Sequence, residues 1–143
     1  MLKDVYFSLG TNLGDRKENL EEAIRRLDLE LGVPAAGLSG IVETAAWGFE
    51  GPDFLNMAAL YRTEKTPREL LRICKSIERE MGRRETLEFG PDGKRIYHSR
   101  IIDIDILLYG DETVDEPDLK IPHPMIEKRP FVKGPLDELR NKN

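Results

Sequence analysis

The sequence predicts an α+β protein built on an antiparallel sheet. Two segments have the apolar spacing of amphipathic helices, others have the alternation of strands, and the segments follow one another as strand, helix, strand, strand, helix, strand. That order is typical of the split βαβ, or ferredoxin-like, unit, in which the helices pack on one face of the sheet and long loops connect the elements. The opposite face is then open to a ligand or a partner.

The first two elements are a strand and a helix. Residues 5–9 alternate apolar side chains and are rich in strand-forming residue types. Over residues 15–31 the apolar positions recur at helical spacing. Asp15, followed three positions later by Glu18, resembles a capping box, and Gly32 ends the pattern. The sequence therefore predicts one amphipathic helix after the first strand.

The central part predicts two strands and a second helix. Residues 38–44 and 54–62 are strand-like and are expected to pair across a long loop. Thr66 and Glu69 have the spacing of a capping box at the start of the second helix. Cys74 lies on the apolar face of this helix, so we expect a core thiol rather than a nucleophile.

The last part of the chain contains the strongest strand signal. Residues 101–109 (IIDIDILLY) alternate acidic and apolar side chains before an apolar run. Residues 83–100 are polar and charged without a sustained period, so they predict a long loop, and such loops in small domains are often functional. The proline-rich remainder is expected to be mostly irregular, with short helical turns near residues 123–128 and 135–140.

Length and composition limit the class of protein. The 143 residues fit one domain, residues 1–143, which needs no disulfide or metal to fold. A net charge of −5 disfavours general nucleic-acid binding, which depends on excess positive charge. A single cysteine excludes an internal disulfide, and no run approaches the roughly 18 apolar residues of a membrane span. We expect a cytoplasmic monomer that binds neither nucleic acid nor membrane.

Two aspartates in the last predicted strand form the first candidate site. The strand period of two places Asp103 and Asp105 on one face, while the alternate isoleucines and Leu108 face the helices. Two like charges roughly 6 Å apart repel by about 2–3 kcal/mol at an effective dielectric of about 20. A cation is therefore expected between them. Magnesium is the natural candidate, since it binds one or two carboxylates together with water and phosphate oxygens.

The alternative is that the two aspartates pair with Arg95 or Arg100 on a solvated face. Basic residues do concentrate in or beside the predicted loop, and a further one follows later: Arg83, Arg84, Lys94, Arg95, Arg100 and Arg129. In an acidic protein this cluster favours a metal-bound polyphosphate, because the planar guanidinium group matches phosphate oxygens.

Phe54 and Asn56 form a second candidate site. They share a strand face and offer an aromatic plate beside an amide that both donates and accepts hydrogen bonds. This pair suits a flat heterocycle, although an aromatic residue in a strand is more often part of the core. The segment 10–15 lacks the Gly-Lys-Ser/Thr ending of a phosphate loop, and His98 and His123 are too few for a zinc site.

Several segments together carry a resemblance to a known family. They are FSLGTNLGD, TAAWGFEGPDFLN, the helix end at residues 78–83, RIIDIDILLYGDETVD and IPHPMIEKRPFVKGPL. In this order and spacing the chain, from Tyr6 to about Leu139, resembles the 6-hydroxymethyl-7,8-dihydropterin pyrophosphokinases of folate biosynthesis. The resemblance implies transfer of diphosphate from ATP to the hydroxymethyl group of the pterin, release of AMP, and two Mg²⁺ ions.

The resemblance also implies roles for individual residues. The residues that match the magnesium-binding aspartates are Asp103 and Asp105. The residues that match catalytic, phosphate-binding arginines are Arg83 and Arg100. Further ATP contacts are implied for Lys75, Glu78, His123 and Arg129. The implied pterin pocket, with the ring between two phenylalanines, consists of Thr44, Phe54, Asn56 and Phe131.

Departures from the family pattern leave some assignments open. The segment 84–99 is longer than usual by several residues, so the second loop arginine is either Arg84 or Arg95. Ala46 replaces a common proline, and the sequence ends soon after Leu139, before the family's usual C-terminal extension, but no metal ligand is lost. The general base stays open, with Asp105 one candidate. The rival functions are a nucleotidyltransferase, which releases pyrophosphate, and a non-catalytic binding module.

Overall fold

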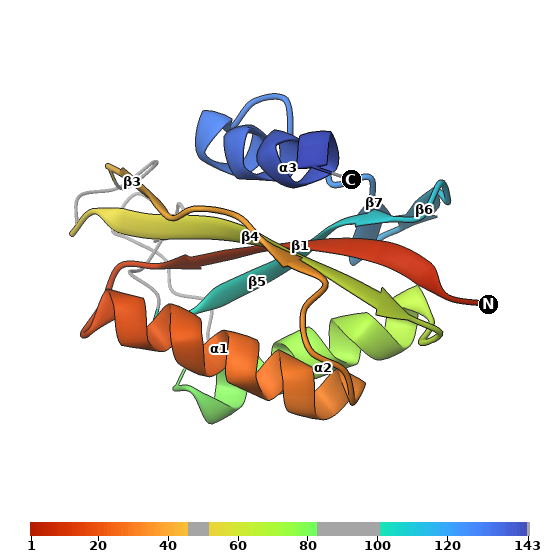
Figure 1. Ribbon diagram of the computed structural model, residues 1–143, viewed down its shortest axis with the longest axis horizontal. Helices are drawn as coiled ribbons and strands as arrows, with labels where there is room; N and C mark the ends of the chain where they lie inside the picture. The colour runs from red at the N-terminus through yellow and green to blue at the C-terminus, as the bar shows by residue number, and fades with distance from the viewer. Residues whose placement is uncertain (46–51, 83–100, 143) are drawn as a thin grey trace, which may run out of the picture.

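The computed structural model describes residues 1–45, 52–82 and 101–142 (Figure 1). These residues form a main antiparallel sheet, a separate two-stranded sheet and helices on both faces of the main sheet. The elements are β1 (Lys3–Thr11), α1 (Arg16–Leu31), β2 (Gly37–Leu38), β3 (Val42–Thr44), β4 (Phe54–Thr63), α2 (Pro67–Glu80), β5 (Asp103–Tyr109), β6 (Val114–Glu116), β7 (Leu119–Ile121) and α3 (Pro130–Lys142). The mixed α/β class with an antiparallel sheet is confirmed.

The main sheet has the strand order β2-β4-β1-β5, and β3 also pairs with β4. β1 lies between β4 and β5 and is antiparallel to both. α1 and α2 cover one face of this sheet (Figure 1). β1 is therefore the strand that aligns β4 and β5 relative to each other.

The main core fills the layer between the sheet and these two helices. Val5, Phe7 and Leu9 lie at alternate positions of β1, and their side chains are fully buried in this core. Burying such side chains stabilises the fold by about 1.5–3 kcal/mol each. Cys74 of α2 is also in this core, where burial raises the pKa of its thiol well above the ordinary value. The predicted core thiol is confirmed.

The start of α2 has the predicted capping box. The Thr66 side chain accepts a hydrogen bond from the Glu69 N–H at 3.2 Å, and the Glu69 carboxylate accepts one from the Thr66 N–H at 2.9 Å. Two N–H groups that the helix itself cannot pair are thereby satisfied. Asp15 caps α1 by accepting from the Glu18 N–H at 3.1 Å.

Removing the cap of α2 should cost a measurable part of the stability. We expect Thr66→Ala to lower the free energy of unfolding by about 1 kcal/mol, because the Glu69 N–H loses its acceptor. Urea unfolding followed by circular dichroism measures the change. Thr113→Ala, at an exposed position outside the helices and strands, is the control. Equal stability of the two variants would contradict the role given to Thr66.

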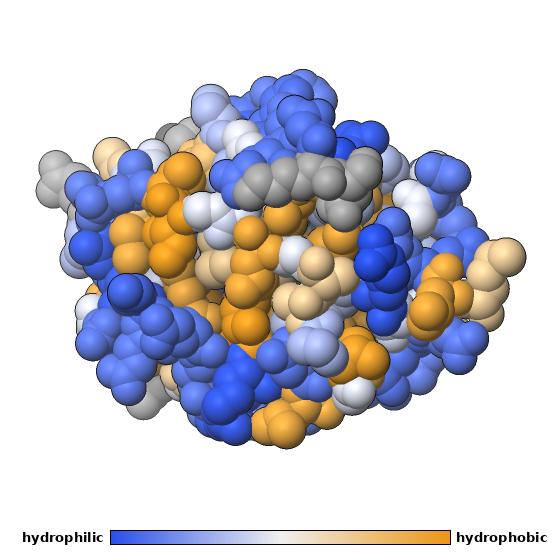
Figure 2. All heavy atoms as spheres, viewed as in Figure 1, coloured by the Kyte–Doolittle hydropathy of each residue, from blue (hydrophilic) through white to orange (hydrophobic). Residues whose placement is uncertain are grey.

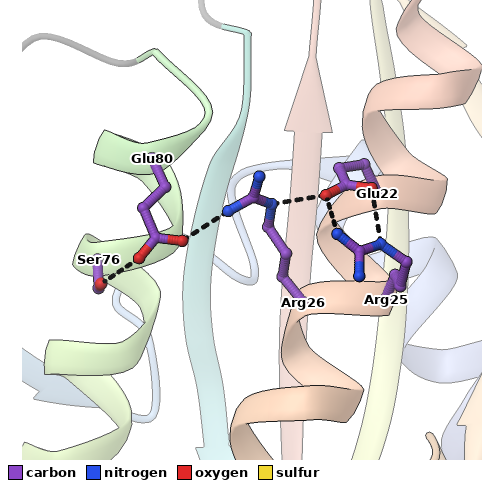
Figure 3. A network of polar contacts seen from close by, with 5 residues as sticks. All are labelled: Glu22, Arg25, Arg26, Ser76 and Glu80. Carbon is purple, nitrogen blue, oxygen red and sulfur yellow. Dashed lines mark hydrogen bonds and ion pairs between the residues drawn. The ribbon is translucent and has the colours of Figure 1, made fainter.

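The C-terminal half of α2 is joined to α1 by charged side chains (Figure 3). Arg26 donates to Glu22 of its own helix at 2.7 Å and to Glu80 of α2 at 2.5 Å. Hydrogen bonds from Arg25 and Arg26 lower the pKa of Glu22 to about 2. Exposed ion pairs add little stability, so this network mainly orients the two helices.

α3 corrects the prediction that the helices pack on one face only. It lies on the face opposite α1 and α2 (Figure 1) and buries Val132, Leu136 and Leu139 there. The sheet residues that complete this second core are Tyr6, Ala58, Leu60 and Leu107. The sequence predicted only short turns here because Pro135 suggests a helix break, whereas the helix continues through it.

A β-bulge in β5 changes the face of its last residues. Tyr6 and Phe7, adjacent in β1, pair with Leu108 and Ile106, so one residue of β5 is extra. Before the bulge, Ile104 and Ile106 face the main core as predicted. Beyond it, Leu108 packs against the second core, so the prediction that it faces α1 and α2 is wrong. The alternation of the sequence does not reveal the inserted residue.

The predicted strand 38–44 is two short strands, β2 and β3, because Ser39 interrupts it. The Ser39 hydroxyl accepts from the Ala58 N–H at 2.8 Å and donates to the Gly40 carbonyl at 2.8 Å. Gly40 then donates its N–H to Glu138 of α3 at 3.0 Å. Local hydrogen bonds of a serine thus replace the regular ladder.

Part of the surface is apolar. Figure 2 shows hydrophobic atoms over the strands between α3 and α1, with hydrophilic atoms over the two helices. Leu38, Ile41 and Val42, on and between β2 and β3, are 39–46% exposed. Within the described ranges, none of the helices has the length and apolar character that crossing a bilayer requires.

Candidate active site

Three neighbouring strands place the candidate residues in two rows across the sheet. In the first row, Gly10 of β1 pairs with Asn56 of β4 on one side and with Asp103 of β5 on the other. The next row consists of Ala58, Ser8 and Asp105. Side chains in one row point to the same face of an antiparallel sheet. Both acids therefore share a face with Asn56, and this is the face on which α3 packs.

Asp105 interacts electrostatically with Asp103 and with Glu78 of α2. Asp103 and Asp105 are both partly exposed, whereas Ile104 between them is buried in the main core. Burial, followed by the like charges of Asp103 and Glu78, raises the pKa of Asp105 well above its ordinary value. This direction is that of a carboxyl group surrounded by other acids. An added cation would relieve the repulsion.

Basic groups reach this environment from two other elements. Arg129, just before α3, and Lys75 of α2 both lower the pKa of Asp105, in opposition to the stronger causes that raise it. The Lys75 ammonium lies 3.7 Å from the Glu78 carboxylate. The acids are therefore only partly compensated by the basic residues that the structure describes.

His123 lies beside the acids through its contact with β5. Its backbone N–H donates to the Leu107 carbonyl at 3.0 Å, and its Nδ1 accepts from the Met125 N–H at 3.1 Å. Since Nδ1 is an acceptor, the proton of the neutral ring lies on Nε2. Burial and then Arg129 lower the pKa of His123, while Asp103 opposes them. At neutral pH the ring offers one N–H donor toward a ligand.

The lowered pKa of His123 can be measured directly. We expect its imidazole to titrate below the ordinary value of 6.5, in NMR spectra of a His98→Gln variant that leaves one histidine signal. Because the unfolded chain then binds the proton more readily, His123 should reduce stability as the pH falls below about 6.5. A titration midpoint above 6.5 would contradict this environment.

Asn56 is a buried amide with unused hydrogen-bonding capacity. It is 4% exposed, and its Nδ2 has no hydrogen-bond partner among the residues that the structure describes. A buried donor without a partner costs about 1–3 kcal/mol. A ligand acceptor is the partner that this arrangement favours.

Gly10 provides the space for Asn56 and Phe54. A Cβ atom placed on Gly10 would lie 2.9 Å from Asn56 Oδ1 and 3.7 Å from Phe54 Cδ1. The aromatic ring and the amide therefore lie together over the backbone of β1, as their shared strand face predicted. Only a glycine leaves them this room.

The acid pair suits magnesium better than zinc. In the described part of the chain no group of three or more His, Cys, Asp or Glu residues could hold a metal ion. Zinc sites need three or four such ligands, whereas Mg²⁺ binds through one or two carboxylates together with phosphate and water oxygens. The two aspartates thus fit a metal that arrives with a phosphorylated ligand.

Comparison with known proteins identifies the family. The family model described as 7,8-dihydro-6-hydroxymethylpterin-pyrophosphokinase matches residues 6–141. The chain belongs to this family. A 2-amino-4-hydroxy-6-hydroxymethyldihydropteridine pyrophosphokinase of Porphyromonas gingivalis is 43% identical over 137 residues, which is 94% of this chain and 89% of the relative. One of Aquifex aeolicus is also 43% identical, over 136 residues, 94% of this chain and 79% of the relative.

A pea relative shows the same domain within a longer protein. The mitochondrial folate synthesis bifunctional protein of Pisum sativum is 39% identical over 138 residues, which are 96% of this chain and 25% of that protein. The segment that matches this chain is therefore one part of a longer protein in that relative.

For this member of the pyrophosphokinase family, the structure brings together many of the residues that the sequence singled out. One group surrounds the acid pair and consists of Asp103, Asp105, Lys75, Glu78, His123 and Arg129. Phe54 and Asn56 form the other group, and Thr44 of β3 pairs with Phe54. Their contacts with ATP, metal and pterin stay predictions.

Other predicted residues are placed apart or not described. Phe131 lies on α3 and packs against the second core, so the sandwich of a ring between it and Phe54 stays a prediction. Arg83 and Arg100, the alternatives Arg84 and Arg95, and the predicted loop 83–100 lie outside the described residues, as does Ala46.

Sequence reasoning missed Gly10 as a site residue. The strand predicted for residues 5–9 stops short of Gly10, whereas β1 continues through it to Thr11. A glycine inside a strand is itself a signal of a close approach by another group. The pairing with Asn56, which gives this glycine its meaning, depends on the register of β4 and not on local sequence.

Proposed function

We propose that the chain transfers a diphosphate group from ATP to the hydroxymethyl group of 6-hydroxymethyl-7,8-dihydropterin and releases AMP, a step of folate biosynthesis. Membership of the pyrophosphokinase family supports this activity. The single structural observation that carries it is the row Asn56–Gly10–Asp103, which puts a buried amide on the same face as the acid pair, with β1 between them. A flat heterocycle and a polyphosphate would thus meet on one face of the sheet.

The proposed metal site consists of Asp103 and Asp105, which would hold two Mg²⁺ ions together with the ATP phosphates. The donor set fits, because both carboxylates lie on one face, and burial and neighbouring acids raise the pKa of Asp105 more strongly than Arg129 and Lys75 lower it. Bound magnesium would neutralise phosphate charge as it develops during transfer. The two aspartates would hold the metal ions at the start of β5.

The pterin would lie over Gly10. The buried amide of Asn56 has both a hydrogen-bond donor and an acceptor, so it can pair with the edge of the ring. Phe54 supplies a flat apolar surface beside it. Thr44 and Phe131 complete the proposed pocket. In this proposal the hydroxymethyl group of the bound ring would point along the row toward Asp103.

The ATP would be bound by residues around the acids. His123 offers its Nε2–H, and Arg129 offers a planar guanidinium group. We assign further ATP contacts to Lys75 and Glu78. The catalytic contacts to the transferred phosphates are assigned to Arg83 and Arg100.

In the proposed reaction the pterin hydroxyl oxygen attacks the β-phosphorus of ATP. A bond forms between these atoms, the bond from the β-phosphorus to the oxygen that bridges it to the α-phosphorus breaks, and AMP leaves with that oxygen. The hydroxyl proton passes to a base that stays unassigned. Such transfers depend mainly on alignment and charge stabilisation, which are the contributions of the residues above.

We also propose the finer features that the sequence suggested. The order of β1, α1, β2 with β3, β4, α2 and β5 supports a ferredoxin-like core to which α3 is added. The single cysteine supports a cytoplasmic location, and the acidic composition argues against nucleic-acid partners. A monomer is part of the same proposal.

The products of the reaction test the proposal. The purified chain, incubated with ATP, Mg²⁺ and 6-hydroxymethyl-7,8-dihydropterin, should produce one AMP for each pterin diphosphate formed. Chromatography of the nucleotides separates the rivals. Release of pyrophosphate would indicate a nucleotidyltransferase, and unchanged ATP with intact protein would indicate a binding module.

A further inference from the structure

We infer that Glu78 is a positioning residue, which holds the backbone of β5 between the two acids and so fixes their spacing. The inference rests on the proposed function for its meaning, and it differs from a contact between Glu78 and ATP. It concerns a hydrogen bond inside the protein, from a carboxylate on α2 to a backbone amide of β5.

The contact itself is short and buried. Glu78 lies in the last turns of α2 and is 1% exposed. Its Oε2 accepts a hydrogen bond from the Ile104 N–H at 2.8 Å. Ile104 stands between Asp103 and Asp105 in the chain and is itself 3% exposed. The bond thus acts on the one residue whose backbone joins both acids.

The position of β5 explains why an acceptor is needed there. β5 is the last strand in the order β2-β4-β1-β5, so its outward N–H groups face no further strand among the described residues. An unpaired buried N–H costs about as much as a lost hydrogen bond. The Glu78 carboxylate satisfies this group and ties the start of β5 to α2.

The need for a hydrogen-bond acceptor at the Ile104 N–H does not by itself explain why that acceptor is a charged carboxylate. Glu78 is one of the acids that surround Asp105, and a third negative charge there is unfavourable. Lys75, 3.7 Å away, compensates it only from an exposed position. What the site gains is a fixed direction for Asp103 and Asp105, and groups that orient metal ligands change metal affinity by about 10–100-fold when removed.

Two substitutions separate the hydrogen bond from the charge. Glu78→Gln keeps the length and an acceptor oxygen but removes the charge. Glu78→Asp keeps the charge but withdraws it by one carbon–carbon bond, about 1.5 Å, so that it no longer reaches Ile104. Glu80→Gln, an exposed glutamate of the same helix, is the matched control.

Three measurements read out the effect. Amide hydrogen exchange at Ile104 reports the bond in the protein without ligand. Calorimetry with Mg²⁺ and α,β-methylene-ATP, in which the bond to be broken is replaced, reports binding. We expect Glu78→Gln to keep slow exchange at Ile104 and to bind the analogue more tightly than Glu78→Asp does. Glu78→Asp should exchange faster at Ile104 and lose about tenfold or more in affinity relative to the parent. Turnover by Glu78→Asp should fall in kcat with little change in the KM for pterin.

The opposite pattern overturns the inference. If Glu78→Asp retained full affinity while Glu78→Gln lost it, Glu78 would act through its charge on the ligand. Unchanged exchange and affinity in both variants would show that the bond positions nothing. If the parent protein made no AMP, the proposed function would fail, whereas slow exchange at Ile104 in the Glu78→Gln variant and fast exchange in Glu78→Asp would still support the hydrogen bond.

Discussion

Replacing either aspartate of β5 should reduce turnover roughly 10²- to 10³-fold, with the fold intact. We expect this of Asp103→Asn and Asp105→Asn, which keep the shape of the side chain but remove a charged ligand of magnesium. The free energy of unfolding should stay equal or rise, because each substitution removes one acid from the mutually repelling group of Asp103, Asp105 and Glu78. Steady-state release of AMP and urea unfolding measure the two effects.

The control for this pair lies two residues beyond the same strand. Asp111 is exposed in the turn after β5, and Asp111→Asn should leave both turnover and stability unchanged. Near-normal AMP release by Asp103→Asn and by Asp105→Asn would contradict the metal site. A large loss of stability in either variant would show that the acids serve the fold instead.

A methyl group at Gly10 should close the pterin side of the site. In Gly10→Ala the new Cβ would lie 2.9 Å from Asn56 Oδ1, so the amide would have to move. Overpacking of this kind costs about 1–3 kcal/mol. We expect the KM for pterin to rise about tenfold or more, while the affinity for Mg²⁺ with α,β-methylene-ATP changes little. Kinetics with varied pterin and calorimetry with the analogue measure the two.

Gly134→Ala is the matched control for this substitution. Nothing lies within 4 Å of a Cβ at Gly134 of α3, so the change should be neutral or slightly stabilising. An unaltered KM for pterin in Gly10→Ala would contradict the placement of the ring over β1. An equal loss of nucleotide and pterin binding would indicate a general distortion of β1.

Local patterns in the sequence predicted the main elements because local interactions determine them. The capping box of α2, the Asp15 cap of α1, the helical spacing of both helices and the period of β1 all depend on residues a few positions apart. α3 was missed because three leucine and valine contacts with the sheet outweigh the unfavourable Pro135. The bulge in β5 was missed because it is defined by the partner strand.

The candidate site divides in the same way. The shared face of Asp103 and Asp105, and that of Phe54 with Asn56, followed from the strand period alone. The sequence could not show that these two pairs lie on one face on either side of Gly10, because that depends on how β4, β1 and β5 are aligned with one another. Burial of Glu78 against β5 required the packing of α2, and no local pattern distinguishes it from an exposed glutamate.

The central claim is that the two acids of β5 bind metal-bearing ATP. Calorimetric titration of α,β-methylene-ATP into the parent protein and into Asp103→Asn/Asp105→Asn, each with and without Mg²⁺, tests it most directly. We expect binding to the parent to require Mg²⁺ and to be lost in the double variant, which should remain folded. Binding that is independent of Mg²⁺, or equally tight in the double variant, would contradict the claim.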